Sequence, residues 1–282
     1  MNLIYIVWDI SPEIFSIPLD TPLVGGLSVR WYGLLFAFSF IFGYIIMKKM
    51  FINEGLGEKE LDQVSTFMLV STIVGARLGH CLFYEPSYYL SHPFEILKIW
   101  EGGLASHGAA VGIFIGLYIF TRINKKPYLW ILDRMAIIVA LSGFFIRSGN
   151  LMNSEIFGDI TSLPWGFIFI RYYDPVLAID PRHPTQIYEA LGYLTIFVFL
   201  YRFYWKQKGK TNNGEIFGYF MVLLFGLRFL IEFIKVPQVG FEETMFLNMG
   251  QILSIPLILT GFIMLWISRR NKNLGVRNHD KK

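Results

Sequence analysis

Long apolar runs recur along the whole chain and limit what it can fold into more than any other feature. A helix crosses a bilayer core of about 30 Å with roughly 20 apolar residues. Apolar runs of about this length predict about seven membrane spans. They are residues 31–47, 66–83, 104–120, 135–146, 187–204, 216–234 and 252–267. The fourth is short, and we expect it to begin near Ile131 and to end close to Arg147. Only 16% of the 282 residues are charged, against about 25% in a soluble domain, so the sequence predicts an all-α, polytopic integral membrane bundle.

Basic side chains fall mainly in alternate loops, and this sets the expected orientation. Lys and Arg favour cytoplasmic loops over outer ones. Most of the 25 basic residues lie within four segments, which are residues 48–59, 122–134, 202–210 and 269–282. We therefore expect the N-terminus outside and the C-terminal tail, residues 268–282, in the cytoplasm. Because this bias accounts for most of the basic residues and nucleic-acid motifs are absent, we expect no nucleic-acid partner.

The sequence shows no repeat, low-complexity segment or flexible linker that would divide it into domains. We therefore expect a single transmembrane domain over residues 1–282. The first thirty residues lack the basic start and apolar run of a cleavable signal peptide, and prolines interrupt them. We expect residues 1–30 to form an irregular or interfacial lead-in on the outer side. Cys81 is the only cysteine, and we interpret it as a packing residue rather than a nucleophile.

Arginines inside or beside the spans indicate a functional site. A charge at mid-bilayer costs about 2.5 to 3.5 kcal/mol on insertion scales, so an ionisable group there suggests a function. Glu232 follows Arg228 by one helical turn, and Lys235 continues the same stripe. Two interpretations remain open: a structural ion pair within the bundle, or an Arg228 guanidinium that Glu232 orients to bind an anion in bidentate geometry.

Three further positions can be interpreted in two ways each. Arg77 and His80 lie one turn apart in the second predicted span, where either backbone carbonyls satisfy them or they contact a substrate. His107, at the outer start of the third span, is either an interfacial histidine hydrogen-bonded to backbone or a group that moves a proton near neutral pH. Glycines that recur at intervals of four beyond it predict a close helix-packing face; these are Gly108, Gly112 and Gly116.

The densest polar segment, residues 147–158, starts at the expected end of the fourth span. It combines one cation, two amides, a carboxylate and two glycines, in the order Arg147, Gly149, Asn150, Asn153, Glu155 and Gly158. The amides can donate hydrogen bonds to phosphate or hydroxyl oxygens, and the glycines permit tight backbone geometry. An ordinary helix-ending turn needs only one such residue, so the segment predicts a binding site. The histidines have no metal-ligand spacing, so we expect no metal site.

These motifs resemble those of the prolipoprotein diacylglyceryl transferases, a family of bacterial inner-membrane enzymes. The resemblance extends in the same order over nearly the whole chain, through residues 30–33, 75–79, 100–108, 147–158, 181–189, 228–233 and 249–256. It implies a seven-span protein of the cytoplasmic (inner) membrane with a site facing the outer leaflet and the periplasm. It also implies the reaction: diacylglyceryl passes from phosphatidylglycerol to the lipobox cysteine thiol of a preprolipoprotein, a thioether forms and glycerol phosphate leaves. No cofactor is implied.

The resemblance carries functional roles to eight positions, which are Tyr32, His107, Arg147, Asn150, Glu155, Gly158, Arg228 and Glu232. Arg147 and Arg228 are expected to bind the phosphate, with Glu232 orienting Arg228. Asn150 is expected to contact the headgroup glycerol, beside the other lipid-binding positions. His107 is the candidate base for the thiol, with an arginine-centred activation as the alternative.

The chain departs from the family pattern at two positions. Lys235 stands where many members have a second arginine, and Leu224 where a tyrosine often precedes the sixth-span arginine. Lysine still neutralises phosphate but lacks the bidentate fork. A direct role for Lys235 is therefore left open.

Two other classes of membrane protein also place arginines within the bilayer. One is a transporter or channel for an anionic lipid or solute. Many transporters contain internal repeats, and this sequence has none. The other is a structural lipid-binding protein, which does not account for the dense polar run from Arg147 to Glu155. The transferase is therefore the favoured function.

Overall fold

The computed structural model describes residues 5–17, 27–99, 102–174, 178–236 and 245–279. Trp100 and Glu101, which belong to one of the motifs above, lie outside these ranges. The described chain forms two compact units by contact, one of residues 1–46 with 135–282 (unit 1) and one of residues 47–134 (unit 2).

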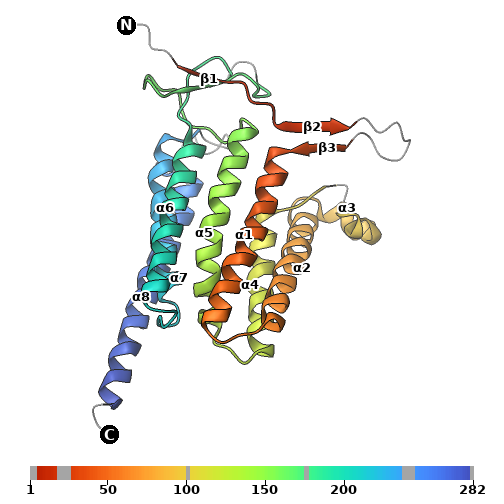
Figure 1. Ribbon diagram of the computed structural model, residues 1–282. Helices are drawn as coiled ribbons and strands as arrows, with labels where there is room; N and C mark the ends of the chain where they lie inside the picture. The colour runs from red at the N-terminus through yellow and green to blue at the C-terminus, as the bar shows by residue number, and fades with distance from the viewer. Residues whose placement is uncertain (1–4, 18–26, 100–101, 175–177, 237–244, 280–282) are drawn as a thin grey trace. The chain divides into compact units, whose positions relative to one another are not determined.

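Long helices occupy the predicted spans in order (Figure 1). They are α1 (Trp31–Asn53), α2 (Glu58–Phe83), α4 (Ser106–Ile123), α5 (Tyr128–Met152), α6 (Thr185–Lys206), α7 (Glu215–Ile231) and α8 (Met249–His279). Within the described ranges, six helices are long and apolar enough to cross a membrane. The prediction of a mostly helical, multi-pass membrane protein is confirmed. The helix α6, which contains Glu189 and Arg202, is not among the six, so the number seven stays a prediction.

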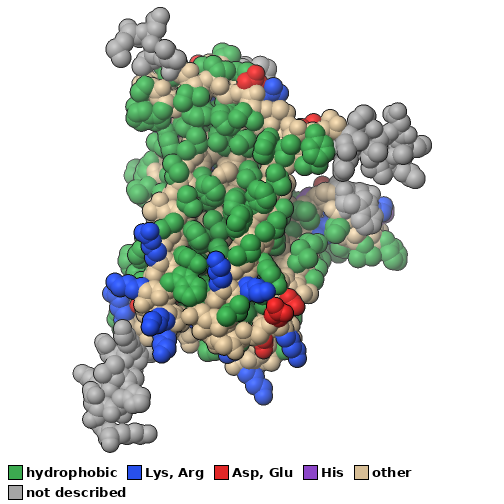
Figure 2. All heavy atoms as spheres, in the orientation of Figure 1, with side chains coloured by type: hydrophobic (Ala, Val, Ile, Leu, Met, Phe, Trp, Pro, Cys, Tyr) green, Lys and Arg blue, Asp and Glu red, His purple; other side chains and the backbone are tan. Residues whose placement is uncertain are grey.

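The exposed side chains of the spanning helices are largely hydrophobic, the reverse of a water-soluble bundle. In α2, for example, Val70 and Leu82 are both about half exposed. Figure 2 shows hydrophobic side chains over most of the drawn surface of the helices. Since lipid offers no hydrogen bonds, a spanning segment satisfies its backbone internally as a helix and presents apolar side chains outward.

Unit 2 is built on the close contact of α2 with α4. A Cβ placed on Gly75 would lie 2.5 Å from the carbonyl oxygen of Gly108 and 2.9 Å from Cα of Gly112. A Cβ on Gly79 would lie 2.6 Å from Cα of Gly108. Backbone therefore meets backbone, which only glycine permits. The predicted packing face at Gly108, Gly112 and Gly116 is confirmed, with α2 as its partner. The short helices α3 (Pro86–Ser91) and η1 (Pro93–Leu97) connect these two helices along the chain.

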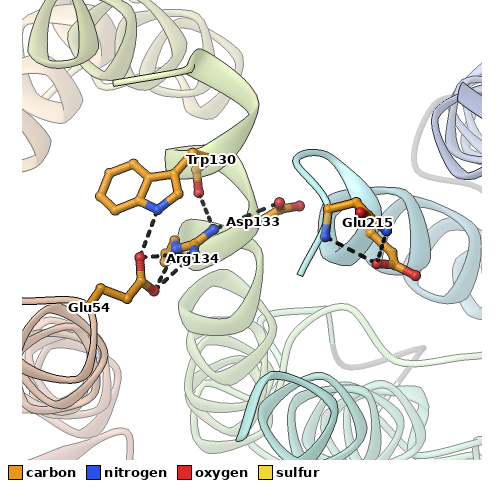
Figure 3. A network of polar contacts seen from close by, with 6 residues as sticks. Glu54, Trp130, Asp133, Arg134 and Glu215 are labelled. Carbon is orange, nitrogen blue, oxygen red and sulfur yellow. Dashed lines mark hydrogen bonds and ion pairs between the residues drawn. The ribbon is translucent and has the colours of Figure 1, made fainter. Parts of the chain in front are cut away.

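A buried arginine near the other end of unit 2 has its own counterion. The Arg134 side chain is 2% exposed, and its Nε and Nη2 atoms each donate to the Glu54 carboxylate at 3.0 Å. Trp130 completes the network (Figure 3), because its Nε1 atom donates to Glu54 at 2.7 Å and its ring lies under the guanidinium. The planar guanidinium, with its fork of parallel N–H groups, matches the carboxylate in bidentate geometry. This cation is satisfied by structure alone.

Unit 1 packs α6, α7 and α8 through small residues as well. A Cβ on Gly218 would lie 2.9 Å from Leu265 of α8, and one on Gly261 would lie 2.8 Å from Val222 of α7. Gly192 of α6 gives similar room to Leu227 of α7. Close approach at these points holds the helices together where lipid supplies no hydrophobic driving force.

Four short strands accompany the helices of unit 1, and three of them lie within residues 1–30, which we expected to be an irregular or interfacial lead-in. The strand β1 (Ile6–Trp8) pairs in parallel with β4 (Phe167–Phe169), and β2 (Glu13–Ile17) pairs antiparallel with β3 (Leu27–Arg30). The partner of β1 is distant in sequence, so the N-terminal segment alone gives no sign of the pairing. These strands satisfy backbone groups outside the helices.

An aromatic core lies beside the polar segment of residues 147–158. Phe157, Phe167 and Phe169 are buried together, and Trp8 and Leu151 pack against them. The indole nitrogen of Trp8 donates to the carbonyl of Leu151 at 3.0 Å. Strand β1 and the end of α5 are thereby joined, and this core supports the polar segment from one side.

Candidate active site

The helix α5 continues through Arg147 and ends at Met152, so the expectation that it ends close to Arg147 is wrong. The polar residues do not stop the helix, because backbone bonds within the helix are unaffected by polar side chains that project from it. Arg147 and Asn150 therefore lie one turn apart, and Nη1 of Arg147 donates to Oδ1 of Asn150 at 3.1 Å. The chain then turns, with Ser154 and Ile156 at positive φ.

Glu155 gathers the amides of this segment. Its Oε1 atom accepts hydrogen bonds from the side-chain amides of Asn150 at 2.8 Å and Asn153 at 3.1 Å. Its carbonyl oxygen accepts one from Gln186 at 2.6 Å. Each asparagine gives one hydrogen bond to Glu155 and has a second N–H, so the expected donation to substrate stays a prediction. The carboxylate therefore fixes the turn and ties it to the start of α6.

Glu189 is a central residue of the site that the sequence reasoning missed. It is fully buried in α6, with Oε2 at 2.9 Å from Nε of Arg147 and Oε1 at 3.4 Å from Nζ of Lys235. Among the described residues no well-directed hydrogen bond reaches Oε2, so its contact with Arg147 is mainly Coulombic. The signal was present, because an acidic residue within a predicted span is itself a functional indication.

Lys235 is buried at the same place, directly after α7 and the 3₁₀ helix η3 (Glu232–Ile234). Burial lowers the pKa of Lys235, the charges of Arg147 and Arg228 lower it further, and Glu189 and Glu232 oppose the change. The side chain therefore lies within electrostatic range of all four other charged groups. Three basic and two acidic residues form one cluster in unit 1.

Gly158 brings three chain segments together beside this cluster. Its amide donates to the carbonyl of His183 at 2.8 Å, and it forms an antiparallel bridge with Lys235. A Cβ at this position would meet the carbonyl oxygen of Ile234 and lie 2.7 Å from Cγ2 of Thr185. The absence of a side chain therefore allows the Lys235 segment to reach Glu189.

Tyr32 approaches the polar segment from the start of α1. A Cβ on Gly149 would lie 2.7 Å from Cδ2 of its ring, so the glycine makes room for the ring. The charges of Glu155 and Arg147 both act on the Tyr32 hydroxyl. Tyr32, Arg147, Asn150 and Glu155, which the sequence assigned to one site, are thus brought together.

Arg228 and Glu232 are less closely joined than their spacing predicts. The helix α7 ends at Ile231, but Glu232 keeps helical backbone angles and its amide donates to the carbonyl of Arg228, so the two residues still lie one turn apart. Within the described ranges no ion pair of 4 Å or less joins the two side chains, so the orienting role of Glu232 stays a prediction. The carboxylate is buried against Gly250, where a Cβ would lie 2.5 Å from its Cδ atom.

Several buried acceptor atoms in unit 1 have no hydrogen-bond donor among the residues that the structure describes. They are Oδ1 of Asn153, Oε1 of Gln186, Oε2 of Glu189 and Oε2 of Glu232. Such atoms are costly to bury unpartnered, and they are suited to accept hydrogen bonds from hydroxyl groups. In the same described ranges no cluster of His, Cys, Asp and Glu could hold a metal ion.

The remaining predicted residues belong to unit 2. His107 is exposed in the first turn of α4. Arg77 is buried in α2 and donates to backbone carbonyls, the first of the two interpretations that the sequence allowed.

The sequence matches the family described as prolipoprotein diacylglyceryl transferase over residues 21–267. The chain belongs to this family. It is 46% identical over 274 residues to a protein of Porphyromonas gingivalis, covering 93% of each chain. It is 43% identical to one of Tolumonas auensis, covering 94% of this chain and 98% of that protein, and 42% identical to one of Chloroherpeton thalassium, covering 96% and 97%. All three relatives are named phosphatidylglycerol–prolipoprotein diacylglyceryl transferase. The predicted family and the predicted transferase class are confirmed.

Proposed function

We propose that this protein transfers the diacylglyceryl group of phosphatidylglycerol to the lipobox cysteine thiol of a preprolipoprotein, at the outer leaflet of the bacterial inner membrane. The observation that carries the proposal is the pairing of Arg147 and Lys235 with the buried Glu189, with Arg228 within electrostatic range of Lys235. Within a family of this name, such a cluster provides positive charge for an anionic headgroup. Most other buried cations of the chain, such as Arg134, are satisfied by structure.

In the proposed reaction the cysteine sulfur attacks the glyceryl carbon that carries the phosphate. A carbon–sulfur bond forms, the carbon–oxygen bond breaks, and glycerol phosphate leaves with the electron pair of that bond. Negative charge therefore grows on the phosphate oxygen as the bond breaks, and preorganised cations beside it lower the barrier. The thiol proton has to be removed first, since a free thiol has a pKa of about 8.5.

Arg147 is the best placed of the cations to bind the phosphate. Nε faces Glu189, and Nη1 donates to Asn150. A guanidinium has more N–H groups than these contacts use, so donors remain for a phosphate oxygen. Glu189 fixes the direction of the guanidinium. Its negative charge also offsets the mutual repulsion of Arg147, Arg228 and Lys235. Lys235 adds charge without the fork, and Arg228 supplies a second fork.

The headgroup glycerol of phosphatidylglycerol carries two hydroxyl groups, which are hydrogen-bond donors. The unpartnered acceptors on Asn153, Gln186 and Glu232 favour a ligand of this kind. A headgroup that ends in a trimethylammonium group has no such donor. This contrast supports phosphatidylglycerol as the lipid and predicts discrimination against phosphatidylcholine.

His107 is the proposed base for the thiol proton. Imidazole is half protonated near neutral pH and is therefore suited to proton transfer. Its exposure at the start of α4 allows an incoming peptide to reach it. Tyr32, Glu155 and Gly158 complete the lipid-binding set in our proposal.

The test is transfer of label from radiolabelled phosphatidylglycerol to a peptide that bears a lipobox cysteine, with purified protein in detergent. We expect Arg147→Lys to insert and fold but to lose most of the transfer, because lysine cannot replace the fork. The control is Arg122→Lys, a change at an exposed arginine of α4. Full activity of Arg147→Lys would remove the phosphate role, and lipid binding without transfer by the unaltered protein would favour a lipid-binding or transport protein.

A further inference from the structure

Arg77 makes an unusual set of contacts for a buried cation. Nε donates to the carbonyl of Ile96 at 2.9 Å, and Nη2 to that of Glu95 at 2.6 Å. Nη1 donates to the carbonyls of Gly102 at 2.6 Å and Gly103 at 3.4 Å. One guanidinium therefore joins the helix η1 to a turn several residues further along the chain.

The turn that Arg77 holds has a special backbone. Gly102 and Gly103 have φ values of 92° and 69°, a region that side chains with a Cβ rarely adopt. A Cβ on Gly103 would also lie 2.6 Å from Cδ2 of His80 and 2.8 Å from Nη1 of Arg77. The turn thus lies directly against two side chains of α2.

The same face of α2 also fixes the residues that follow the turn. The amide of Ala105 donates to the carbonyl of Ala76 at 2.9 Å. Gly108 meets Gly79 backbone to backbone. His107 lies between these two anchor points, in the first turn of α4. Its backbone position is therefore set by the contacts that α2 makes on either side of it.

We propose that Arg77 is a positioning residue for His107. Arg77 holds the Gly102–Gly103 turn, and this turn determines where α4 begins. The start of α4 in turn determines the position of the His107 imidazole. The proposal rests on the proposed function, in which His107 takes the thiol proton. Lysine cannot do the same, because its three donors share one nitrogen and cannot reach carbonyls on both η1 and the turn.

A purely structural arginine and a positioning arginine differ in a double-mutant cycle. We would measure kcat for diacylglyceryl transfer in Arg77→Lys, His107→Gln and the combined variant. We expect Arg77→Lys to lower kcat by about 100-fold, the effect of misplacing a reacting group by about 1 Å, with KM for the lipid unchanged. In the His107→Gln background we expect no further loss, because the residue acts through His107. The same fractional loss in both backgrounds would overturn the proposal.

A second variant covers the case in which Arg77→Lys fails to fold. Gly103→Ala leaves Arg77 in place but adds a Cβ against it, and we expect the same loss of kcat only when His107 is present. Its matched control is Gly55→Ala, where φ is 73° and a Cβ would meet nothing within 4 Å. An equal loss in the control would show that backbone strain, rather than the position of His107, causes the effect, and would refute the proposal.

Hydrogen exchange tests the contacts without using activity. In Arg77→Lys we expect faster exchange at the amide of Ala105, while amides in the middle of α7 are unchanged. Unchanged exchange at Ala105 would refute the positioning role even in an active enzyme. If the unaltered protein transfers no diacylglyceryl, the proposed function fails instead, and faster exchange would show that the contacts of Arg77 are as described.

Discussion

Replacing Glu189 by glutamine tests the centre of the charged cluster. The change keeps the size of the side chain but removes a charge that lies 2.9 Å from Arg147 and 3.4 Å from Lys235. At an effective dielectric constant of about 20, these attractions are about 6 and about 5 kcal/mol before the cost of desolvation. Breaking a buried pair by removing one partner destabilises a protein by about 3 to 5 kcal/mol, because the remaining charge is uncompensated.

We expect Glu189→Gln to lie toward the lower end of that range. The pKa of Lys235 is already lowered by burial, so with the carboxylate gone this lysine can release its proton and relieve part of the cost. Arg147 has no such escape, because a guanidinium does not deprotonate in proteins. Lys235→Met in the same background should therefore recover little stability.

The free energy of unfolding can be measured by titrating the detergent-solubilised protein with sodium dodecyl sulfate. The matched control is Glu13→Gln, which breaks an exposed ion pair with Arg30 at 3.4 Å, worth about 0 to 1 kcal/mol. A loss for Glu189→Gln no larger than that of the control would refute the reasoning. We also expect lipid transfer to fall, since Arg147 loses the group that directs it.

Two further predictions concern residues on either side of the site. Gly158→Ala should reduce transfer more than it reduces stability, because the new Cβ meets Ile234 and displaces Lys235, at an overpacking cost of about 1 to 3 kcal/mol. The control Gly226→Ala, with nothing within 4 Å of the added Cβ, should change neither transfer nor stability. Equal effects of the two variants would contradict this prediction. Glu54→Gln should lower the free energy of unfolding by about 3 to 5 kcal/mol in the same titration, because Arg134 loses its counterion. The KM for phosphatidylglycerol should be unaltered, and a large change in it would mean that this network does more than stabilise unit 2.

The sequence predicted those features that depend on residues close together in the chain. Hydropathy placed the long helices, and glycines at intervals of four placed the face of α4 that meets α2. The polar run from Arg147 to Gly158 predicted a site, and the structure gathers Tyr32 with it.

What the sequence did not predict depends on pairing between distant segments. Glu189 of α6 pairs with Arg147 of α5, and strand β1 pairs with β4, from which more than half of the chain separates it in sequence. The continuation of the Arg228–Glu232 stripe to Lys235 required α7 to remain helical, but a 3₁₀ turn runs from Glu232 to Ile234 and Lys235 is extended. Helical spacing places side chains on one face only while the helix continues.

Two arginines of α5, Arg134 and Arg147, have counterions on opposite sides of them in chain order, so their ion pairs become possible at different stages of synthesis. Glu54 precedes Arg134 in the chain, so the carboxylate is already made when Arg134 emerges from the ribosome. Glu189 and Lys235 follow Arg147, so its ion pair can form only after α6 has been made, and the whole cluster only after α7. A nascent chain that stops before α6 would carry an uncompensated arginine beside the membrane. Chain order therefore allows the network around Arg134 to form before the charged cluster can.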